Sequence, residues 1–183
     1  MKKSKKSNDS LSIVLLAVCA LLAALSILFG KYLAINLGDS IRLSLENLPI
    51  LLAGFLFGPA AGAVTGTVAD LVGCLLVGYS INPLITLGAA VIGLTAGFAG
   101  KAKRLSRSFK VILAVAGAHL IGSVLIKTIG LTLFYGSPFL ITLAWRALTY
   151  LLVGTIEIVC LWALSGNRSF LKQAARITKE SHK

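Results

Sequence analysis

The chain consists of long apolar runs that polar or basic residues interrupt at only a few places. A run of about 20 apolar residues is long enough to cross the hydrocarbon core of a lipid bilayer, so the runs predict membrane-spanning helices. The interruptions delimit six spans, at residues 11–30, 44–57, 60–78, 83–100, 111–133 and 138–165. The sequence therefore predicts an all-α fold, an integral membrane bundle of six transmembrane helices.

Alternative architectures fit this pattern less well. If the chain crossed the membrane only twice before residue 101, residues 48–99 would form one element of about 50 residues, far longer than a bilayer requires. A β-barrel needs alternating apolar and polar positions, whereas these runs are continuous. The first run, residues 11–30, follows lysines as in a signal peptide. Its length, and the lack of a small-residue cleavage site before Lys31, favour a span.

The distribution of charge predicts the orientation. The chain has 18 Lys and Arg against 6 Asp and Glu, a net charge of +12, and most basic residues fall within residues 2–6, 101–110 and 168–183. Basic loops stay on the cytoplasmic side of a membrane, so both termini are expected there. We expect three parts: a cytoplasmic basic N-terminal tail (1–10), a six-helix membrane domain (11–165) and a cytoplasmic basic C-terminal tail (166–183).

Composition and missing motifs exclude several classes of protein. With 57% hydrophobic and 13% charged residues, the chain is not an ordinary soluble domain. The basic clusters are short connections between spans, so nucleic acid is not an expected partner. Cys19, Cys74 and Cys160 lie in apolar segments without the spacing of a disulfide framework or zinc site. Nucleotide, zinc-protease and serine-hydrolase motifs are missing, so we expect no enzyme, no cofactor and no metal.

Small residues recur at four-residue spacing, which lets helices approach closely in lipid. The pairs are Ala20 and Ala24, Gly62 and Gly66, Ala69 and Gly73, and Gly93 and Gly97. Such a stripe packs either against another helix of this chain or against a separate membrane protein, and the sequence leaves both open.

Ionisable residues inside the spans are the first candidates for function, because a charge in a bilayer is costly and faces a cavity or a partner. The expected topology places Asp70, Lys127 and Arg146 in the outer half of the membrane. An internal ion pair of Asp70 with Lys127 or Arg146 is the alternative to a ligand site. His119 and Glu157 fall in the inner half, apart from this group, and a lone histidine is more typical of packing or hydrogen bonding than of catalysis.

Aromatic residues gather on the same outer side, at Tyr32, Tyr79, Phe134, Tyr135, Trp145 and Tyr150. An aromatic belt at the membrane surface is the alternative explanation for the first two and Tyr135, whereas Trp145 and Tyr150 lie deeper, beside Arg146. Aromatic walls with a few cations and amides suit a flat heteroaromatic ligand that carries carboxylates. Asp70 and Asn82 are candidates for contacts with its ring amino or amide groups.

Two stretches carry a resemblance to a known family. Residues 41–73 (IRLSLENLPILLAGFLFGPAAGAVTGTVADLVG) and 82–97 (NPLITLGAAVIGLTAG) resemble the substrate-binding S components of energy-coupling factor (ECF) transporters, most closely the folate-specific FolT family. The resemblance covers nearly the whole chain. Its FGP-to-DxxG run is more specific for S components in general than for one vitamin. The resemblance implies a multi-pass protein of the bacterial cytoplasmic membrane.

The resemblance also implies a mode of action. S components bind a vitamin on the outer face and dock on a membrane-embedded coupling subunit (EcfT-like), which carries two cytoplasmic ATPases. They are thought to topple within the membrane to deliver the vitamin inward, and ATP hydrolysis belongs to the partners. The docking stripe of the family's first helix maps onto Ala20 and Ala24. Family ligands are held by the first loop and the outer parts of helices four to six.

Folate has a pterin, an aminobenzoate and a glutamate, and each part suggests partners. We expect stacking walls from Tyr79, Phe134, Trp145 and Tyr150, with Tyr135 beside them. Asp70 and Asn82 are expected at the pterin edge, and Lys127 and Arg146, with Arg42 or Lys31, near the carboxylates. One alternative is an S component for pantothenate, a hydroxymethylpyrimidine or riboflavin. The other is a scaffold subunit without a ligand, whose charges pair internally.

Overall fold

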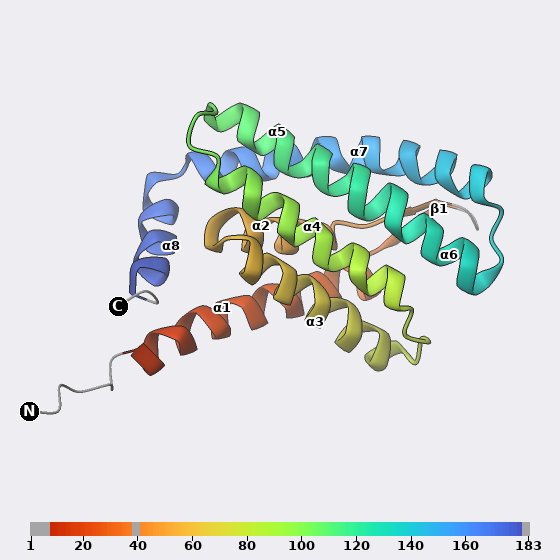
Figure 1. Cartoon of the computed structure of the whole chain (residues 1–183), viewed down its shortest axis with the longest axis horizontal. Coiled ribbons are helices and arrows are strands. Elements are labelled where there is room, and N and C mark those ends of the chain that lie inside the picture. The colour runs from red at the N-terminus through yellow and green to blue at the C-terminus, as the bar shows by residue number, and fades with distance from the viewer. Residues whose placement is uncertain (1–7, 38–40, 181–183) are drawn as a thin grey trace, which may run out of the picture.

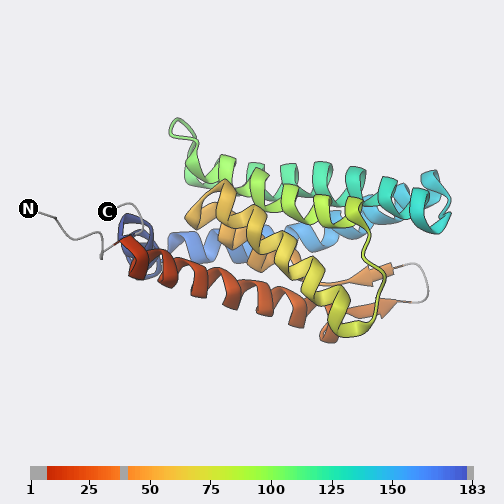
Figure 2. The same cartoon turned by 60° about the horizontal axis from the view of Figure 1, so that its bottom comes forward.

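The chain forms an elongated bundle of long helices (Figures 1 and 2). The computed structural model describes residues 8–37 and 41–180, with side chains for residues 13–35 and 43–177. Its helical elements are α1 (Asn8–Ile27), η1 (Leu28–Tyr32), α2 (Asn47–Phe57), α3 (Pro59–Val77), α4 (Pro83–Lys101), α5 (Arg107–Gly117), η2 (Ala118–Ile126), α6 (Lys127–Tyr135), α7 (Phe139–Gly166) and α8 (Arg168–Glu180). Strands β1 (Ile35–Leu37) and β2 (Ile41–Leu43) pair as a short antiparallel hairpin.

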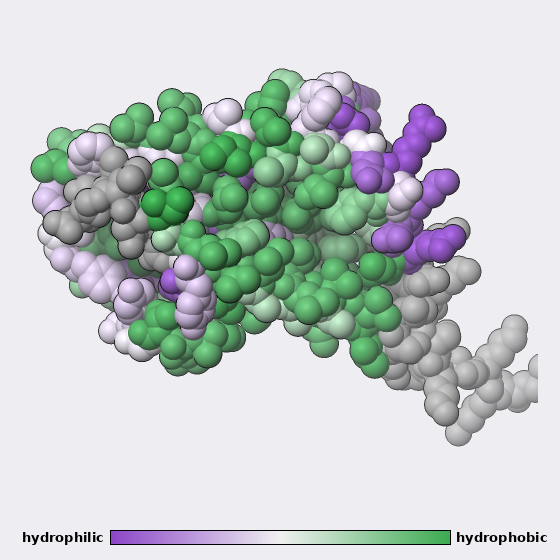
Figure 3. All heavy atoms as spheres, turned by 180° about the vertical axis from the view of Figure 1, so that it is seen from behind, coloured by the Kyte–Doolittle hydropathy of each residue, from purple (hydrophilic) through white to green (hydrophobic). Residues whose placement is uncertain are grey.

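Five helical stretches within the described residues are long and apolar enough to cross a membrane. They are α1 with η1, α3, α4, the continuous helix α5–η2–α6, and α7. Exposed large apolar side chains cover the bundle between its two ends, as Figure 3 shows for one face. Such a surface is unfavourable in water and suits the interior of a bilayer. The predicted all-helical membrane bundle is confirmed, and the small hairpin is an addition that the sequence pattern did not predict.

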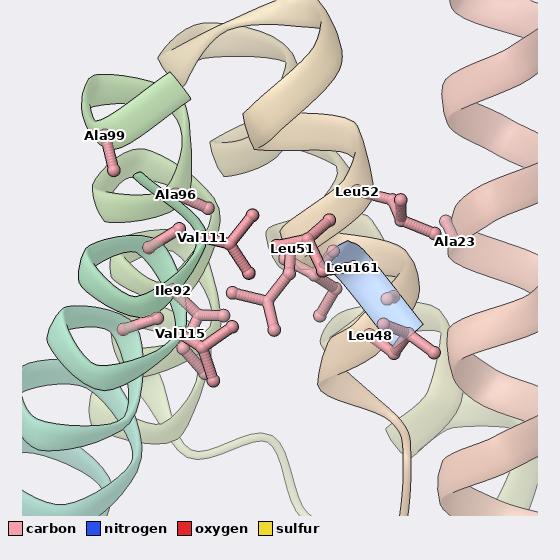
Figure 4. Packing of buried hydrophobic residues seen from close by; sticks show 14 residues of the cluster. Ala23, Leu48, Leu51, Leu52, Ile92, Ala96, Ala99, Val111, Val115 and Leu161 are labelled. Atoms are coloured by element: carbon pink, nitrogen blue, oxygen red, sulfur yellow. The ribbon is translucent and has the colours of Figure 1, made fainter. Parts of the chain in front are cut away.

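The second predicted span, residues 44–57, forms a helix that is shorter than the predicted range. Its helix α2 has 11 residues, which reach only about 16 Å, roughly half of a bilayer core. The segment is apolar because it is enclosed by protein: residues 47–54 are all buried. Leu51 lies at the centre of a core to which α1, α4, α5 and α7 also contribute (Figure 4). Hydropathy alone does not distinguish a helix that faces lipid from one that other helices enclose.

The two ends of the bundle differ in charge. One end, here called the basic end, carries exposed basic side chains from the α4–α5 connection and from α8, namely Lys101, Lys103, Arg104, Arg107, Arg168, Lys172 and Arg176. Hydrophilic side chains gather there in Figure 3. The hairpin and the turns between α3 and α4 and between α6 and α7 lie toward the opposite end (Figure 1).

The segment predicted as a C-terminal tail contains a helix. Asn167 Oδ1 accepts hydrogen bonds from the amides of Ser169 and Phe170 at the start of α8. This is the N-capping arrangement that satisfies the first amides of a helix. α8 packs against α1, α2 and α7 and lies across the basic end (Figure 1). The cytoplasmic location of both tails stays a prediction.

Glycines allow the backbones of α2, α3 and α4 to come into direct contact. A Cβ at Gly93 would lie 2.1 Å from the carbonyl group of Gly62, and a Cβ at Gly54 would lie 2.2 Å from the carbonyl oxygen of Gly93. Gly66 and Gly97 meet backbone atoms of α4 and of the start of α3 in the same way. Close van der Waals packing of this kind holds helices together in lipid, where no hydrophobic force does so.

The alanine pair on α1 differs from the glycine stripes. Ala20 and Ala24 are exposed, whereas Cys19, Ala23 and Ser26 on the other face of α1 are buried. Within the described residues, the stripe therefore faces away from the bundle. It is available to a separate membrane protein.

The Gly62–Gly93 contact can be tested by adding one methyl group. Gly93→Ala should destabilise the fold by about 1–3 kcal/mol, because the atoms it meets are backbone and cannot rotate away. Gly117→Ala is the matched control, since nothing lies within 4 Å of its Cβ position, and alanine favours a helix over glycine. Thermal unfolding in detergent measures both variants. Equal stability of the two would contradict the role given to this contact.

Candidate functional site

A polar cavity of about 660 Å³ lies in the half of the bundle remote from the basic end. Its walls come from six parts of the chain. These are η1, the segment before α2, helix α3 together with the turn that follows it, the first turn of α4, helix α6 and helix α7. The volume falls within the range of about 300–1,000 Å³ that is typical of sites for small organic molecules.

Five charged side chains line this cavity: Lys31, Glu46, Asp70, Lys127 and Arg146. The Nζ atom of Lys127 lies 3.5 Å from Glu46 Oε1, and the lysine side chain is almost fully buried. Three cations thus face two carboxylates, and one cation is already paired. The cavity has an excess of positive charge, which favours an anionic ligand.

Glycines make room for the Glu46–Lys127 pair. A Cβ at Gly30 would lie 2.6 Å from Glu46 Oε2, and a Cβ at Gly88 would lie 2.6 Å from Lys127 Cγ. Sequence reasoning missed Glu46 as a site residue. It counted this residue among the polar loop residues before α2, although a carboxylate directly before a fully apolar helix was a usable signal.

The alternative of an ion pair between Asp70 and Lys127 or Arg146 is not formed among the described residues. Asp70 Oδ2 instead accepts a 2.6 Å hydrogen bond from the hydroxyl of Thr86 on α4. Arg146 donates from Nε to the carbonyl oxygen of Ser123 at 2.9 Å and from Nη2 to the Tyr150 hydroxyl at 3.4 Å. The carboxylate of Asp70 and the guanidinium of Arg146 therefore both face the cavity without neutralising each other.

Three tyrosines form the aromatic part of the wall, Tyr79, Tyr135 and Tyr150. The Nζ atom of Lys31 lies 5.1 Å from the ring centroid of Tyr79, and the guanidinium carbon of Arg146 lies 5.3 Å from that of Tyr150. These are cation–π contacts, which a flat aromatic ligand can extend by stacking.

Two predicted aromatic residues, Phe134 and Trp145, are not among the lining residues. They are 54% and 40% exposed on the outside of the bundle. Successive residues of an α-helix point about 100° apart. Because Tyr135 and Arg146 face the cavity, their chain neighbours Phe134 and Trp145 point toward the surroundings.

Two further candidates need separate description. Asn82 lines the cavity, but its side chain caps α4 by accepting from the amides of Leu84 and Ile85 and donates to the carbonyl oxygen of Gly130 on α6. Its amide thereby ties α4 to α6. Arg42 belongs to β2, and its side chain lies outside the described residues.

The sequence predicted that His119 and Glu157 lie apart from the outer group of residues. In the structure, the two residues instead adjoin the cavity wall. His119 on η2 bonds through Nε2 to Glu157 Oε2 on α7. Its ring also stacks on Tyr150, with ring centroids 4.7 Å apart and an interplanar angle of 23°. Tyr150 lines the cavity, so the buried pair touches the residues that form its wall.

Comparison with known proteins indicates one family. Residues 14–165 match the family model described as ECF transporter, substrate-specific component. A comparison with the curated proteins gives no match.

Several solved structures share the fold. The crystal structure of FolT bound with folic acid has a TM-score of 0.68 and 26% sequence identity, over 85% of this chain and 95% of that chain. The S component of a bacterial ECF transporter has a TM-score of 0.63 and 23% identity, over 85% and 97% of the two chains. The S-component for biotin from an ECF-type ABC transporter has a TM-score of 0.62 and 16% identity, over 87% and 94%.

A double-mutant cycle tests the Glu46–Lys127 pair. Glu46→Gln and Lys127→Met each leave one charge behind in a largely buried site, so the double variant should be more stable than the two single effects added together. We expect a coupling free energy of about 1 kcal/mol from thermal unfolding in detergent. Lys127→Met combined with Asp70→Asn is the matched control and should show less coupling. Additive effects in the first cycle would contradict the pairing.

Proposed function

The chain belongs to the family of substrate-specific components of ECF transporters, and we propose that its substrate is folate. As a member of this family it is a membrane-embedded substrate-binding subunit of a transporter and not an enzyme. The observation that carries the proposal is one cavity that combines three tyrosines with an excess of cations, including the partly buried Arg146.

The chemistry of folate matches these groups. Its pterin and aminobenzoate are flat aromatic systems, which Tyr79, Tyr135 and Tyr150 can stack against. The carboxylate of Asp70 can accept hydrogen bonds from the pterin amino and ring N–H groups. The guanidinium of Arg146 and the ammonium of Lys31 attract the glutamate carboxylates, and charge-assisted hydrogen bonds of this kind are strong. The fold similarity to FolT bound with folic acid, at 26% identity, supports the same substrate.

We further propose the assembly in which this subunit works. Folate enters from the side opposite the basic end, which faces the cytoplasm of a bacterial cell according to the positive-inside rule. The exposed Ala20–Ala24 stripe of α1 docks on a membrane-embedded coupling subunit, because small side chains permit close helix packing in lipid. Two cytoplasmic ATPases attached to that subunit supply the energy.

Calorimetric titration of the purified protein in detergent tests the substrate. We expect tight one-to-one binding of folate and no heat from riboflavin, thiamine, pantothenate or biotin, because each of these offers a different ring or fewer carboxylates to the cavity. Tight binding of one of the other vitamins would discard folate and keep the transporter subunit. A folded protein that binds none of the five would favour a scaffold subunit.

The role of Arg146 can be separated from that of its neighbour Trp145. Arg146→Ala should weaken folate binding by more than about 2 kcal/mol, because it removes a partly buried charge-assisted contact. Trp145→Leu, one residue away on the same helix but outside the cavity, should leave the affinity within about threefold of wild type. The same titration measures both. A larger loss in Trp145→Leu than in Arg146→Ala would reverse the assignment.

A further inference from the structure

Four residues in and behind the cavity wall form a closed ring of contacts. His119 stacks on Tyr150, and its Nδ1 lies 3.1 Å from the hydroxyl of Ser123. The carbonyl oxygen of Ser123 accepts from Nε of Arg146, whose Nη2 donates to the Tyr150 hydroxyl. Tyr150 and Arg146 line the cavity, whereas His119 and Ser123 do not.

The spacing of these residues explains how the ring closes. His119 and Ser123 are four residues apart on η2, and Arg146 and Tyr150 are four residues apart on α7. Residues at this spacing share one face of a helix. η2 and α7 pack against each other and run antiparallel (Figure 1). His119 therefore meets Tyr150, and Ser123 meets Arg146.

Glu157 fixes the ring from the side of the basic end. Its side chain is fully buried, and its Oε2 atom bonds to Nε2 of His119. A carboxylate inside a membrane protein is costly unless it is paired, so any movement of His119 away from Glu157 is strongly opposed. Gly154 allows close packing on the imidazole, since a Cβ there would lie 3.3 Å from His119 Cδ2.

We propose that His119, held by Glu157, is a positioning residue for the substrate. It sets the ring plane of Tyr150 by stacking, and its bond to the Ser123 hydroxyl braces the helical turn whose carbonyl oxygen accepts from Arg146. Both groups meet the substrate in the function proposed above, on which this inference rests. A substrate that engages Tyr150 and Arg146 therefore alters the surroundings of a histidine and a carboxylate that it does not touch.

Nitrogen-15 NMR of the imidazole tests this coupling in the full-length protein. The chain has two histidines, His119 and His182, so His182→Ala leaves one labelled ring to observe. We expect both ring nitrogen signals of His119 to shift at folate saturation and to stay in place with pantothenate, which serves as the control compound. Unchanged signals in protein saturated with folate would overturn the proposal.

A second arm needs no ligand. Tyr150→Leu removes the stacked ring and should shift the His119 signals. Tyr135→Leu, at a cavity tyrosine on α6 whose hydroxyl donates to the carbonyl oxygen of Ser80, should leave them unchanged. If the wild type binds no folate, the proposal that folate is the substrate is refuted. The comparison of these two variants without ligand still tests whether His119 is coupled to Tyr150. His119 signals that are insensitive to Tyr150→Leu would refute the positioning role.

Affinity measurements separate positioning from mere structural support. His119→Leu should weaken folate binding about tenfold, and His119→Phe, which restores a flat ring against Tyr150, should recover part of that loss. Ser165→Ala is the matched control, because Ser165 is a buried polar residue whose hydroxyl donates to the carbonyl oxygen of Trp162 in the same helix α7. Thermal unfolding checks that each variant is folded. Wild-type affinity in folded His119→Leu, or an equal loss in His119→Phe, would contradict the proposal.

Discussion

Direct backbone contact between glycines of α2, α3 and α4 is the constraint on which the rest of the structure depends. Lipid supplies no hydrophobic force between helices, so their association relies on close packing. The carbonyl group of Gly62 lies against Gly93, and that of Gly93 lies against Gly54. This contact encloses the short helix α2 and fixes the first turn of α3 against the middle of α4. It thereby allows Asp70, two turns beyond Gly62 on α3, to meet Thr86 near the start of α4 at the cavity.

Polar groups inside the bundle follow from a second constraint, because every buried charge in a membrane needs a partner. Lys127 pairs with Glu46, and Glu157 bonds through Oε2 to His119, although Glu157 Oε1 has no hydrogen-bond partner among the described residues. Arg146 is held by a backbone carbonyl and a tyrosine hydroxyl, neither of which carries a negative charge. Its charge is therefore available to an anion. This is the physical basis for a substrate that carries carboxylates.

The apolar runs predicted most of the fold because crossing a bilayer imposes a length and a composition on each helix. Their limits appear at α2, whose apolar sequence reflects enclosure by protein, and at α8, whose polar sequence was interpreted as a tail. The stripes of small residues were correctly identified, but only the structure separates the glycines that pack inside the chain from Ala20 and Ala24, which do not.

Depth along a helix predicted part of the cavity, and direction around the helix was the missing information. Arg146 and Trp145 have nearly the same depth, yet only Arg146 faces the cavity. Depth also assigned His119 and Tyr150 to different groups, although their rings stack in the structure. Depth along a helix does not show which side chains of two antiparallel helices meet. Glu46 was missed because it was counted with the loop before α2, and the apolar pattern does not show that this turn carries it into the bundle.

An experimental structure of the protein with folate tests the central claim, that the cavity remote from the basic end is the substrate site. Density for the pterin and aminobenzoate against Tyr79 and Tyr150, with the glutamate near Arg146, is the expected result. Folate bound outside this cavity, for example among the basic side chains at the other end of the bundle, would contradict it.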